Sequence, residues 1–186
     1  MRRAIVFIDG SNFYHRLKEL TLTLEGKFSL LDFHYFDFAK WLIEPNKLMQ
    51  ARYYVAALKR QNNNEKSEKM YADQQKFLGK LQQQNIPVVF GQIIGYPDKT
   101  FHEKGVDVRL AVEMIRFARE DQYDIGYLLS SDTDLVPAVE EVHSFGKQIQ
   151  YVGTAKGQSF GLTKVCDDTR LLRPENIKGF LSHSLL

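Results

Sequence analysis

The sequence has one cysteine, Cys166, and no hydrophobic run that approaches a membrane-spanning length. A single cysteine cannot form an internal disulfide or supply a thiolate metal cluster. Crossing a bilayer takes about 20 predominantly apolar residues, so no membrane contact is expected. The histidines are few and lack the spacing of metal ligands, which argues against a zinc site.

Charge of one sign is also scarce, because the formal net charge is only +2 at pH 7. A balance this small does not by itself indicate a nucleic-acid partner. The amino-terminal residues Met1, Arg2 and Arg3 lead directly into the apolar stretch AIVFIDG. That stretch is too short for a signal-peptide core and has no small-residue cleavage site after it. We therefore interpret it as a first β-strand and expect a cytoplasmic protein.

The length of 186 residues suits one domain, which we place at residues 1–174, with a C-terminal tail at residues 175–186. Five segments are typical of strands, at residues 3–9, 49–58, 86–94, 124–130 and 147–153. Helix-like segments alternate with them, at residues 13–20, 32–44, 65–84, 106–120, 135–145 and 159–172. This alternation predicts an α/β fold in which helices cover both faces of a parallel sheet.

Two aspartates stand where such sheets bind ligands, beyond the carboxyl ends of the strands. Asp9 ends the first strand, and Asp132 follows the fourth. If these two strands are neighbours, about 4.8 Å apart, the two carboxylates can share a cation. The alternative is that each aspartate only forms a turn or a helix cap.

A third carboxylate, Asp107, opens the helix predicted at residues 106–120. On a helical count it shares the apolar face with Ala111, Met114, Ile115 and Ala118. The face predicted to be solvated carries Arg109, Glu113, Arg116 and Glu120. A carboxylate on an apolar face is costly unless it is paired or binds a metal. We therefore favour a functional role for Asp107 over a capping role.

The stretch LLSSDTDLVPAVEEV, residues 129–143, places Asp134 two residues after Asp132. Thr133 or Asp134 can cap the following helix, which has Pro137 in its first turn. One cap requires one polar side chain, so at least one other polar group is left for chemistry. A set of aspartates without His or Cys suits Mg²⁺ or Mn²⁺ and the chemistry of phosphate esters.

Candidate substrate contacts lie near these aspartates. Ser11 and Asn12 follow a glycine that allows a tight turn, and either can cap the first helix. The stretch GTAKGQSFG, residues 153–161, lacks the GxxxxGK[ST] spacing of a nucleotide-binding loop. It can contact a nucleic-acid backbone through Lys156 and Ser159, or Ser159 can cap the last helix.

A further substrate loop is predicted at residues 96–105, YPDKTFHEKG, because this polar segment leads directly into Asp107. Its side chains that can meet phosphates are Lys99, His102 and Lys104. A plain surface loop is the alternative.

Four segments of the sequence together resemble the NYN domain, in its LabA-like (DUF88) branch. In chain order they are VFIDGSNFY, KGVDVRLAVEMI, LLSSDTDLVPAVEEV followed by GKQIQYVG, and SFGLTKVCDD. NYN domains belong to the PIN-like superfamily of metal-dependent nucleases, which most often act on RNA. The resemblance implies a three-layer α/β/α sandwich with a five-stranded parallel sheet in the order 3-2-1-4-5. In that order, strands one and four are neighbours.

The resemblance also implies a catalytic Mg²⁺ or Mn²⁺ site formed by Asp9, Asp107, Asp132 and Asp134. The polar residues around this site are the candidates for substrate contact, namely Ser11, Asn12, Lys104, Ser131, Thr133, Lys156 and Ser159. The family often has glycine where Thr133 stands. It also carries an acidic residue in the last helix, which Asp167 matches better than Asp168.

Two functions follow, a metal-dependent ribonuclease and a non-catalytic RNA-binding or regulatory module that keeps the same fold. The complete acidic set favours the ribonuclease. A phosphatase of the haloacid dehalogenase type would need a D-x-D motif after the first strand, where this sequence has DGSN. RNA is the expected partner. The sequence leaves undecided whether the protein forms a homodimer.

Overall fold

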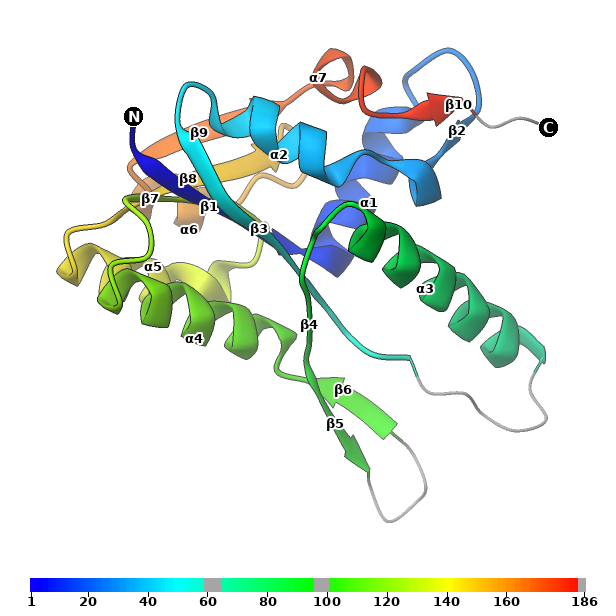
Figure 1. Cartoon of the computed structure of the whole chain (residues 1–186), viewed down its shortest axis with the longest axis horizontal. Coiled ribbons are helices and arrows are strands. Elements are labelled where there is room, and N and C mark those ends of the chain that lie inside the picture. Colours follow the sequence, from blue (N-terminus) through cyan, green and yellow to red (C-terminus); the bar gives the residue numbers. More distant parts are fainter. Residues whose placement is uncertain (59–64, 96–100, 184–186) are drawn as a thin grey trace.

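The computed structural model describes residues 1–58, 65–95 and 101–183, and only the backbone of residues 66, 92–95, 101–104 and 183. Its centre is a six-stranded sheet in the order β4-β3-β1-β7-β8-β9 (Figure 1). Every neighbouring pair of strands in this sheet is parallel. The strands are β1 (Arg3–Asp9), β3 (Lys47–Val55), β4 (Val88–Phe90), β7 (Ile125–Leu129), β8 (Gln148–Thr154) and β9 (Asp168–Leu172).

Helices cover both faces of the sheet, which confirms the predicted α/β sandwich (Figure 1). One face carries α1 (Gly10–Thr21), α2 (Tyr35–Ile43), α3 (Glu65–Gln83) and α7 (Pro174–Lys178). The other carries α4 (Val106–Arg119), α5 (Val136–Ser144) and α6 (Phe160–Val165). Each layer has its own apolar core against the sheet. The central strands β1 and β7 are almost wholly buried, as continuous apolar runs require.

The five predicted strands occur in the predicted spatial order, and β1 pairs with β7 from Ala4 opposite Ile125 to Ile8 opposite Leu129. This pairing brings the carboxyl ends of the two strands together. Asp9 and the polar turn after β7 therefore lie at one edge of the sheet. The α1 helix begins at that edge immediately after β1.

A sixth strand corrects the prediction for residues 159–172, which were expected to form one helix. The helix α6 ends at Val165, and β9 then pairs with β8 from Gln150 opposite Asp168 to Thr154 opposite Leu172. Without β9, one side of β8 would expose unpaired backbone groups. Completing that hydrogen-bond ladder is a long-range gain that helical spacing does not reveal.

Other boundaries also differ from the predictions. The third predicted strand is split, because β4 ends at Phe90 and the chain continues as an antiparallel hairpin of β5 (Gln92–Gly95) and β6 (Phe101–Lys104). The helix expected from residue 32 starts at Tyr35, after a short 3₁₀ turn, η1 (Leu30–Asp32). A second 3₁₀ turn, η2 (Thr133–Leu135), precedes α5.

The described part of the predicted C-terminal tail packs against the domain. Ile177 of α7 is fully buried, and Leu181 is nearly so. A short strand, β10 (Ser182–His183), pairs antiparallel with β2 (Phe28–Ser29). Among the helices of the described residues, none combines the length and the apolar character needed to cross a membrane.

Candidate active site at the carboxyl edge of the sheet

The carboxylate of Asp9 is held by two hydrogen bonds at the end of β1. Its Oδ1 accepts a hydrogen bond of 3.1 Å from the backbone N–H of Asn12, so Asp9 itself caps α1. Its Oδ2 accepts a hydrogen bond of 2.9 Å from the hydroxyl of Ser130. The prediction that Ser11 or Asn12 caps this helix is wrong, because Asp9 is the cap and the helix already includes Ser11 and Asn12.

Asp132 is the corresponding cap in the turn after β7. Its Oδ1 accepts a hydrogen bond of 2.9 Å from the backbone N–H of Asp134, at the start of η2. The prediction that Thr133 or Asp134 supplies this cap is wrong, because an intervening 3₁₀ turn moves the cap upstream. The backbone N–H of Asp132 also donates to the hydroxyl of Ser130 over 3.1 Å. Ser130 therefore links Asp9 to the Asp132 turn.

Asp107 faces the same region from the first turn of α4. It is half-buried, and with Asp9 it lines an open hollow of about 590 Å³. The hollow is lined by Asp9, Ser11, Val55, Ala56, Gly105, Val106, Asp107 and Val108. Gly105 adopts a φ of +82° just before α4, a conformation that favours glycine. This turn leads into Asp107, which lines the same hollow as Ser11 of α1.

The electrostatics of Asp9 follow from its burial. Burial raises the pKa of the Asp9 carboxyl, while the hydrogen bonds from Asn12 and Ser130 act to lower it. The negative charges of Asp132 and Asp107 raise this pKa further. Two carboxylates thus act on Asp9 at this edge, and a bound cation would relieve the repulsion on it.

The donor set fits Mg²⁺ or Mn²⁺, because it consists of carboxylate oxygens from half-buried aspartates, two of which repel the charge of Asp9. Yet among the side chains that the structure describes, no three from His, Cys, Asp and Glu come together closely enough to hold a metal ion on their own. Mg²⁺ commonly keeps several waters and is bound by one or two carboxylates plus substrate phosphates. Such a site would be completed by water and substrate.

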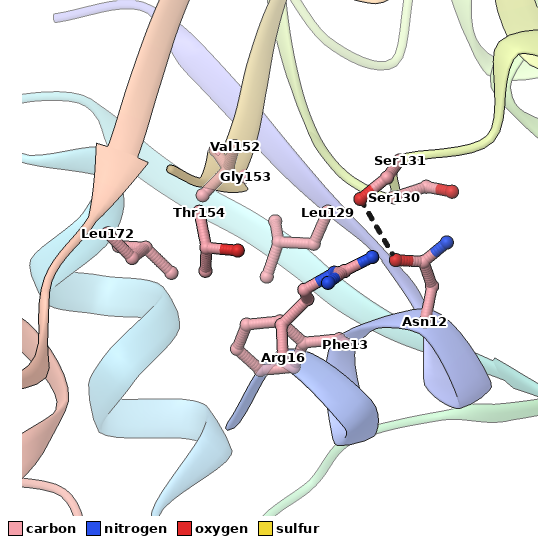
Figure 2. Close-up of a pocket in the computed structure, with 10 residues that line it drawn as sticks. All are labelled: Asn12, Phe13, Arg16, Leu129, Ser130, Ser131, Val152, Gly153, Thr154 and Leu172. Carbon is pink, nitrogen blue, oxygen red and sulfur yellow. Dashed lines mark hydrogen bonds between the residues drawn. The ribbon is translucent and has the colours of Figure 1, made fainter. Parts of the chain in front are cut away.

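Asn12 is oriented toward this edge by a hydroxyl from the neighbouring strand. The Ser131 Oγ donates a hydrogen bond of 3.1 Å to Asn12 Oδ1, and this contact ties the turn after β7 to α1 (Figure 2). The amide nitrogen of Asn12 points away from Ser131 (Figure 2). Because an amide nitrogen carries two hydrogens, Asn12 can donate to a phosphate oxygen.

The remaining predicted residues are placed less centrally. Asp134 and Thr133 are exposed on η2. Ser159 is buried, and its hydroxyl accepts the backbone N–H of Leu162 over 3.3 Å, so it acts as the cap of α6. Lys156 is exposed.

The predicted substrate loop lies largely outside the described residues. Lys99 is not described, and only the backbone of His102 and Lys104 is described, in β6.

Asp167 and Asp168 do not belong to this edge. Asp167 accepts hydrogen bonds from His143 and from the backbone N–H of Ile149, and Asp168 pairs in register with Gln150. Both lie beside the first residues of β8, whereas Asp9 lies at the carboxyl edge. The resemblance left open whether either joins the site, and the structure places both away from it because residues 168–172 form a parallel strand whose start lies at the amino edge of the sheet.

Three functional candidates of α1 were not singled out from the sequence. His15, Arg16 and Glu19 line a second hollow of about 420 Å³, together with Asp9, Ser11 and Asn12. Arg16 and Asn12 also line a small adjoining pocket beside β7 and β8 (Figure 2). The spacing of Asn12, Arg16 and Glu19 places them on one helical face. That spacing was the available signal, but it does not show what the face opposes.

Comparison with known proteins supports the fold described above. The sequence profile of the NYN domain matches residues 3–172. A crystal structure of a protein of unknown function from Vibrio parahaemolyticus superposes with a TM-score of 0.65 and 18% sequence identity, covering 97% of this chain and 96% of that chain. At this identity the likeness shows a shared fold. No curated protein matches the sequence.

Proposed function

This chain belongs to the NYN domain family, and we propose that it is a metal-dependent ribonuclease acting at the carboxyl edge of its sheet. NYN domains are generally nucleases, which supports a nuclease-type function for this chain. RNA as the substrate, divalent-metal dependence, a place in the LabA-like branch and a cytoplasmic location are parts of the proposal. The four segments that resemble this branch support its placement there.

The observation that carries the proposal is the environment of Asp9. This carboxylate is half-buried at a strand end, and the charges of Asp132 and Asp107 act on it. Asp9, Asp107 and Asp132 would hold Mg²⁺ or Mn²⁺, with water and substrate oxygens completing the site. When bound, such an ion activates a water molecule and stabilises negative charge on a phosphodiester.

The protein's own residues prepare this edge before substrate arrives. The Ser130 hydroxyl and the Asn12 N–H fix the carboxylate of Asp9. The Asp134 N–H fixes that of Asp132. Charged oxygens that are held in place by hydrogen bonds lose less freedom when they bind a cation.

Substrate contacts are proposed on both sides of Asp9. The Asn12 amide, oriented by Ser131, would donate to a phosphate oxygen. Ser11 lines both hollows beside Asp9. Thr133 and Lys156 would contact the nucleic acid further out.

A non-catalytic RNA-binding module remains the second candidate. It is favoured by the observation that no three described His, Cys, Asp or Glu side chains are close enough to hold a metal ion by themselves. Binding of RNA without any divalent-dependent cleavage would select this second function.

The test is a cleavage assay on labelled RNA and DNA of matched sequence, single- and double-stranded, in EDTA and with Mg²⁺, Mn²⁺ or Ca²⁺. We expect cleavage of RNA with Mg²⁺ or Mn²⁺ and none in EDTA. Asp107→Asn should remove this activity, whereas Glu120→Gln, at the exposed far end of the same helix, should retain it. Equal cleavage in EDTA, or by both variants, would show that the activity does not come from this site.

A further inference from the structure

We propose that Arg16 and Lys156 form a subsite for a backbone phosphate of the substrate, and that the carboxylate of Glu19 occupies this subsite in the free protein. The identity of the substrate as RNA rests on the proposed function. The subsite itself is defined by Arg16, Lys156 and Glu19, and we call it the phosphate subsite.

The carboxylate of Glu19 contacts both positively charged side chains, Arg16 and Lys156. Arg16 Nη1 donates a hydrogen bond of 2.9 Å to Glu19 Oε2, and Lys156 Nζ lies 3.5 Å from Glu19 Oε1. Both oxygens of Glu19 are thus used, one for each cation. A phosphodiester also presents two anionic oxygens, and it accepts hydrogen bonds from guanidinium and ammonium groups in the same way.

The loop after β8 holds Arg16 in place. Arg16 Nη1 also donates to the backbone carbonyl of Lys156 over 3.2 Å, and the Thr154 hydroxyl donates to the same carbonyl over 2.7 Å. Gly157 has a φ of +75°, and a Cβ added to it would lie 2.4 Å from Arg16 Nη2. The loop therefore packs directly on the guanidinium, which any side chain at position 157 would displace.

The phosphate subsite is continuous with the candidate metal site. Asp9, Asn12, Arg16 and Glu19 line the same hollow of about 420 Å³ along α1. Arg16 is seven residues beyond Asp9, which corresponds to about 10 Å along the helix axis. A nucleic-acid strand with one phosphate at Asp9 would therefore bring another within reach of Arg16.

The contacts of Glu19 with Arg16 and Lys156 are weak enough for a phosphate to replace them. The side chain of Glu19 is 36% exposed and that of Lys156 is 82% exposed, whereas Arg16 is only 23% exposed. Ion pairs at such exposure contribute little to stability, so an arriving phosphate can displace the carboxylate. The buried Nε of Arg16 has no hydrogen-bond partner within the described part of the chain, so Glu19 leaves the guanidinium incompletely satisfied.

Glu19 should therefore act as an internal competitor. The hydrogen bond from Arg16 lowers the pKa of the Glu19 carboxyl, with a smaller contribution from the charge of Lys156, so it stays ionised at neutral pH. A bound phosphate must displace this negative charge from the two cations. The consequence is weaker substrate binding and faster release of product than the cations alone would give.

The experiment measures binding of a fluorescently labelled single-stranded RNA in EDTA, by anisotropy at several salt concentrations. Glu19→Gln should lower Kd about 2- to 5-fold, as expected from removing a competing exposed ion pair. Glu25→Gln is the matched control, because it removes the same charge from an exposed residue outside this hollow. It should change Kd far less.

The role of the Arg16 guanidinium is tested in the same binding assay. Arg16→Gln should weaken binding and lower the salt slope by about 0.7, the value for one phosphate contact on a single strand. Lys18→Gln, an exposed residue of the same helix, is its control. In the Arg16→Gln background, Glu19→Gln should improve binding less than it does in the parent, because only Lys156 is then left for Glu19 to neutralise.

Equal effects of Glu19→Gln and Glu25→Gln would overturn the inference while leaving the proposed nuclease intact. If the parent protein neither binds nor cuts RNA, the proposed function fails instead. The phosphate subsite is then judged with inorganic phosphate, followed by NMR titration of the folded variants. Glu19→Gln must bind phosphate more tightly than Glu25→Gln, and Arg16→Gln must lose that binding. Identical titrations would refute the subsite.

Discussion

The hydroxyl of Ser130 lies 2.9 Å from Oδ2 of Asp9 and donates a hydrogen bond to it, across the junction of β7 and β1. The same hydroxyl accepts the backbone N–H of Asp132. The two aspartates at the ends of neighbouring parallel strands are therefore positioned through one shared side chain. Their placement has consequences for activity and for stability.

Asp132→Asn should abolish metal-dependent cleavage and leave the fold intact. The amide retains the shape of the cap and its acceptor for Asp134 N–H, but it removes the negative charge that attracts a divalent cation. Asp134→Asn should be milder, because the Asp134 side chain is exposed and supplies no cap. The measurement is the RNA cleavage rate of both variants. Cleavage at the parent rate by Asp132→Asn would refute its assignment to the site.

Asp9→Asn should raise the thermal midpoint in EDTA by roughly 2 °C. Burial, with the charges of Asp132 and Asp107, raises the pKa of Asp9 in the folded state. A raised carboxyl pKa means that ionisation costs stability, and this cost grows as the pH rises from about 4 through the folded value. The amide avoids that cost and still caps α1.

Adding Mg²⁺ should raise the thermal midpoint of the parent and not that of Asp9→Asn, since only the parent retains the ligand. Glu25→Gln should respond to Mg²⁺ as the parent does. A lower midpoint for Asp9→Asn in EDTA would instead show that the Asp9 carboxylate is a net stabilising cap.

Gly10→Ala should destabilise the fold by about 2 kcal/mol and reduce cleavage. A Cβ at Gly10 would lie 2.3 Å from Tyr53 Cε1 and 2.7 Å from the Tyr54 carbonyl. Both tyrosines are buried, so the start of α1 must shift and move Asn12 with it. Gly79→Ala is the control, because nothing lies within 4 Å of a Cβ at Gly79 in α3. Urea denaturation should show Gly79→Ala unchanged or up to about 1 kcal/mol more stable.

Glu113→Ala should cost about 3 kcal/mol of unfolding free energy. Glu113 is only 4% exposed, and it accepts hydrogen bonds of 3.0 Å from Arg52 Nε and 2.9 Å from the Tyr54 hydroxyl. Its removal leaves these buried donors without their acceptor. Glu120→Ala, an exposed change on the same segment, should stay within about 0.5 kcal/mol. Similar unfolding curves for the two variants would contradict this account.

Local patterns of the sequence predict much of this architecture. The apolar run that ends in Asp9 and the one that precedes Asp132 are both too continuous to be half-exposed, so both predict buried parallel strands. Their carboxyl ends must then share an edge with other strand ends of the sheet. The resemblance to the NYN domain supplied the strand order, and the structure confirms it for the five predicted strands.

Helical spacing misplaced Glu113 because it records only one element at a time. The residue was assigned to a solvated face, yet α4 packs against both α5 and the sheet. That double contact buries a wider arc, and Arg52 of β3 is there to pair with the carboxylate. A buried charge is tolerated where a partner exists, and the partner is 61 residues away in the sequence.

Local patterns and contacts between distant elements therefore account for different features of this protein. The sequence determined the alternating strands and helices and the aspartates at strand ends, because these depend on neighbours within a few turns or strand residues. The tertiary structure decided that Asp9 and Asp132 are the caps, that residues 168–172 form a sixth strand, and that Arg16 meets Lys156. These outcomes depend on contacts between different elements: Asp9 and Ser130 are 121 residues apart, Arg16 and Lys156 are 140 apart, and β9 pairs with residues 18 positions earlier in β8. No local periodicity encodes such pairings.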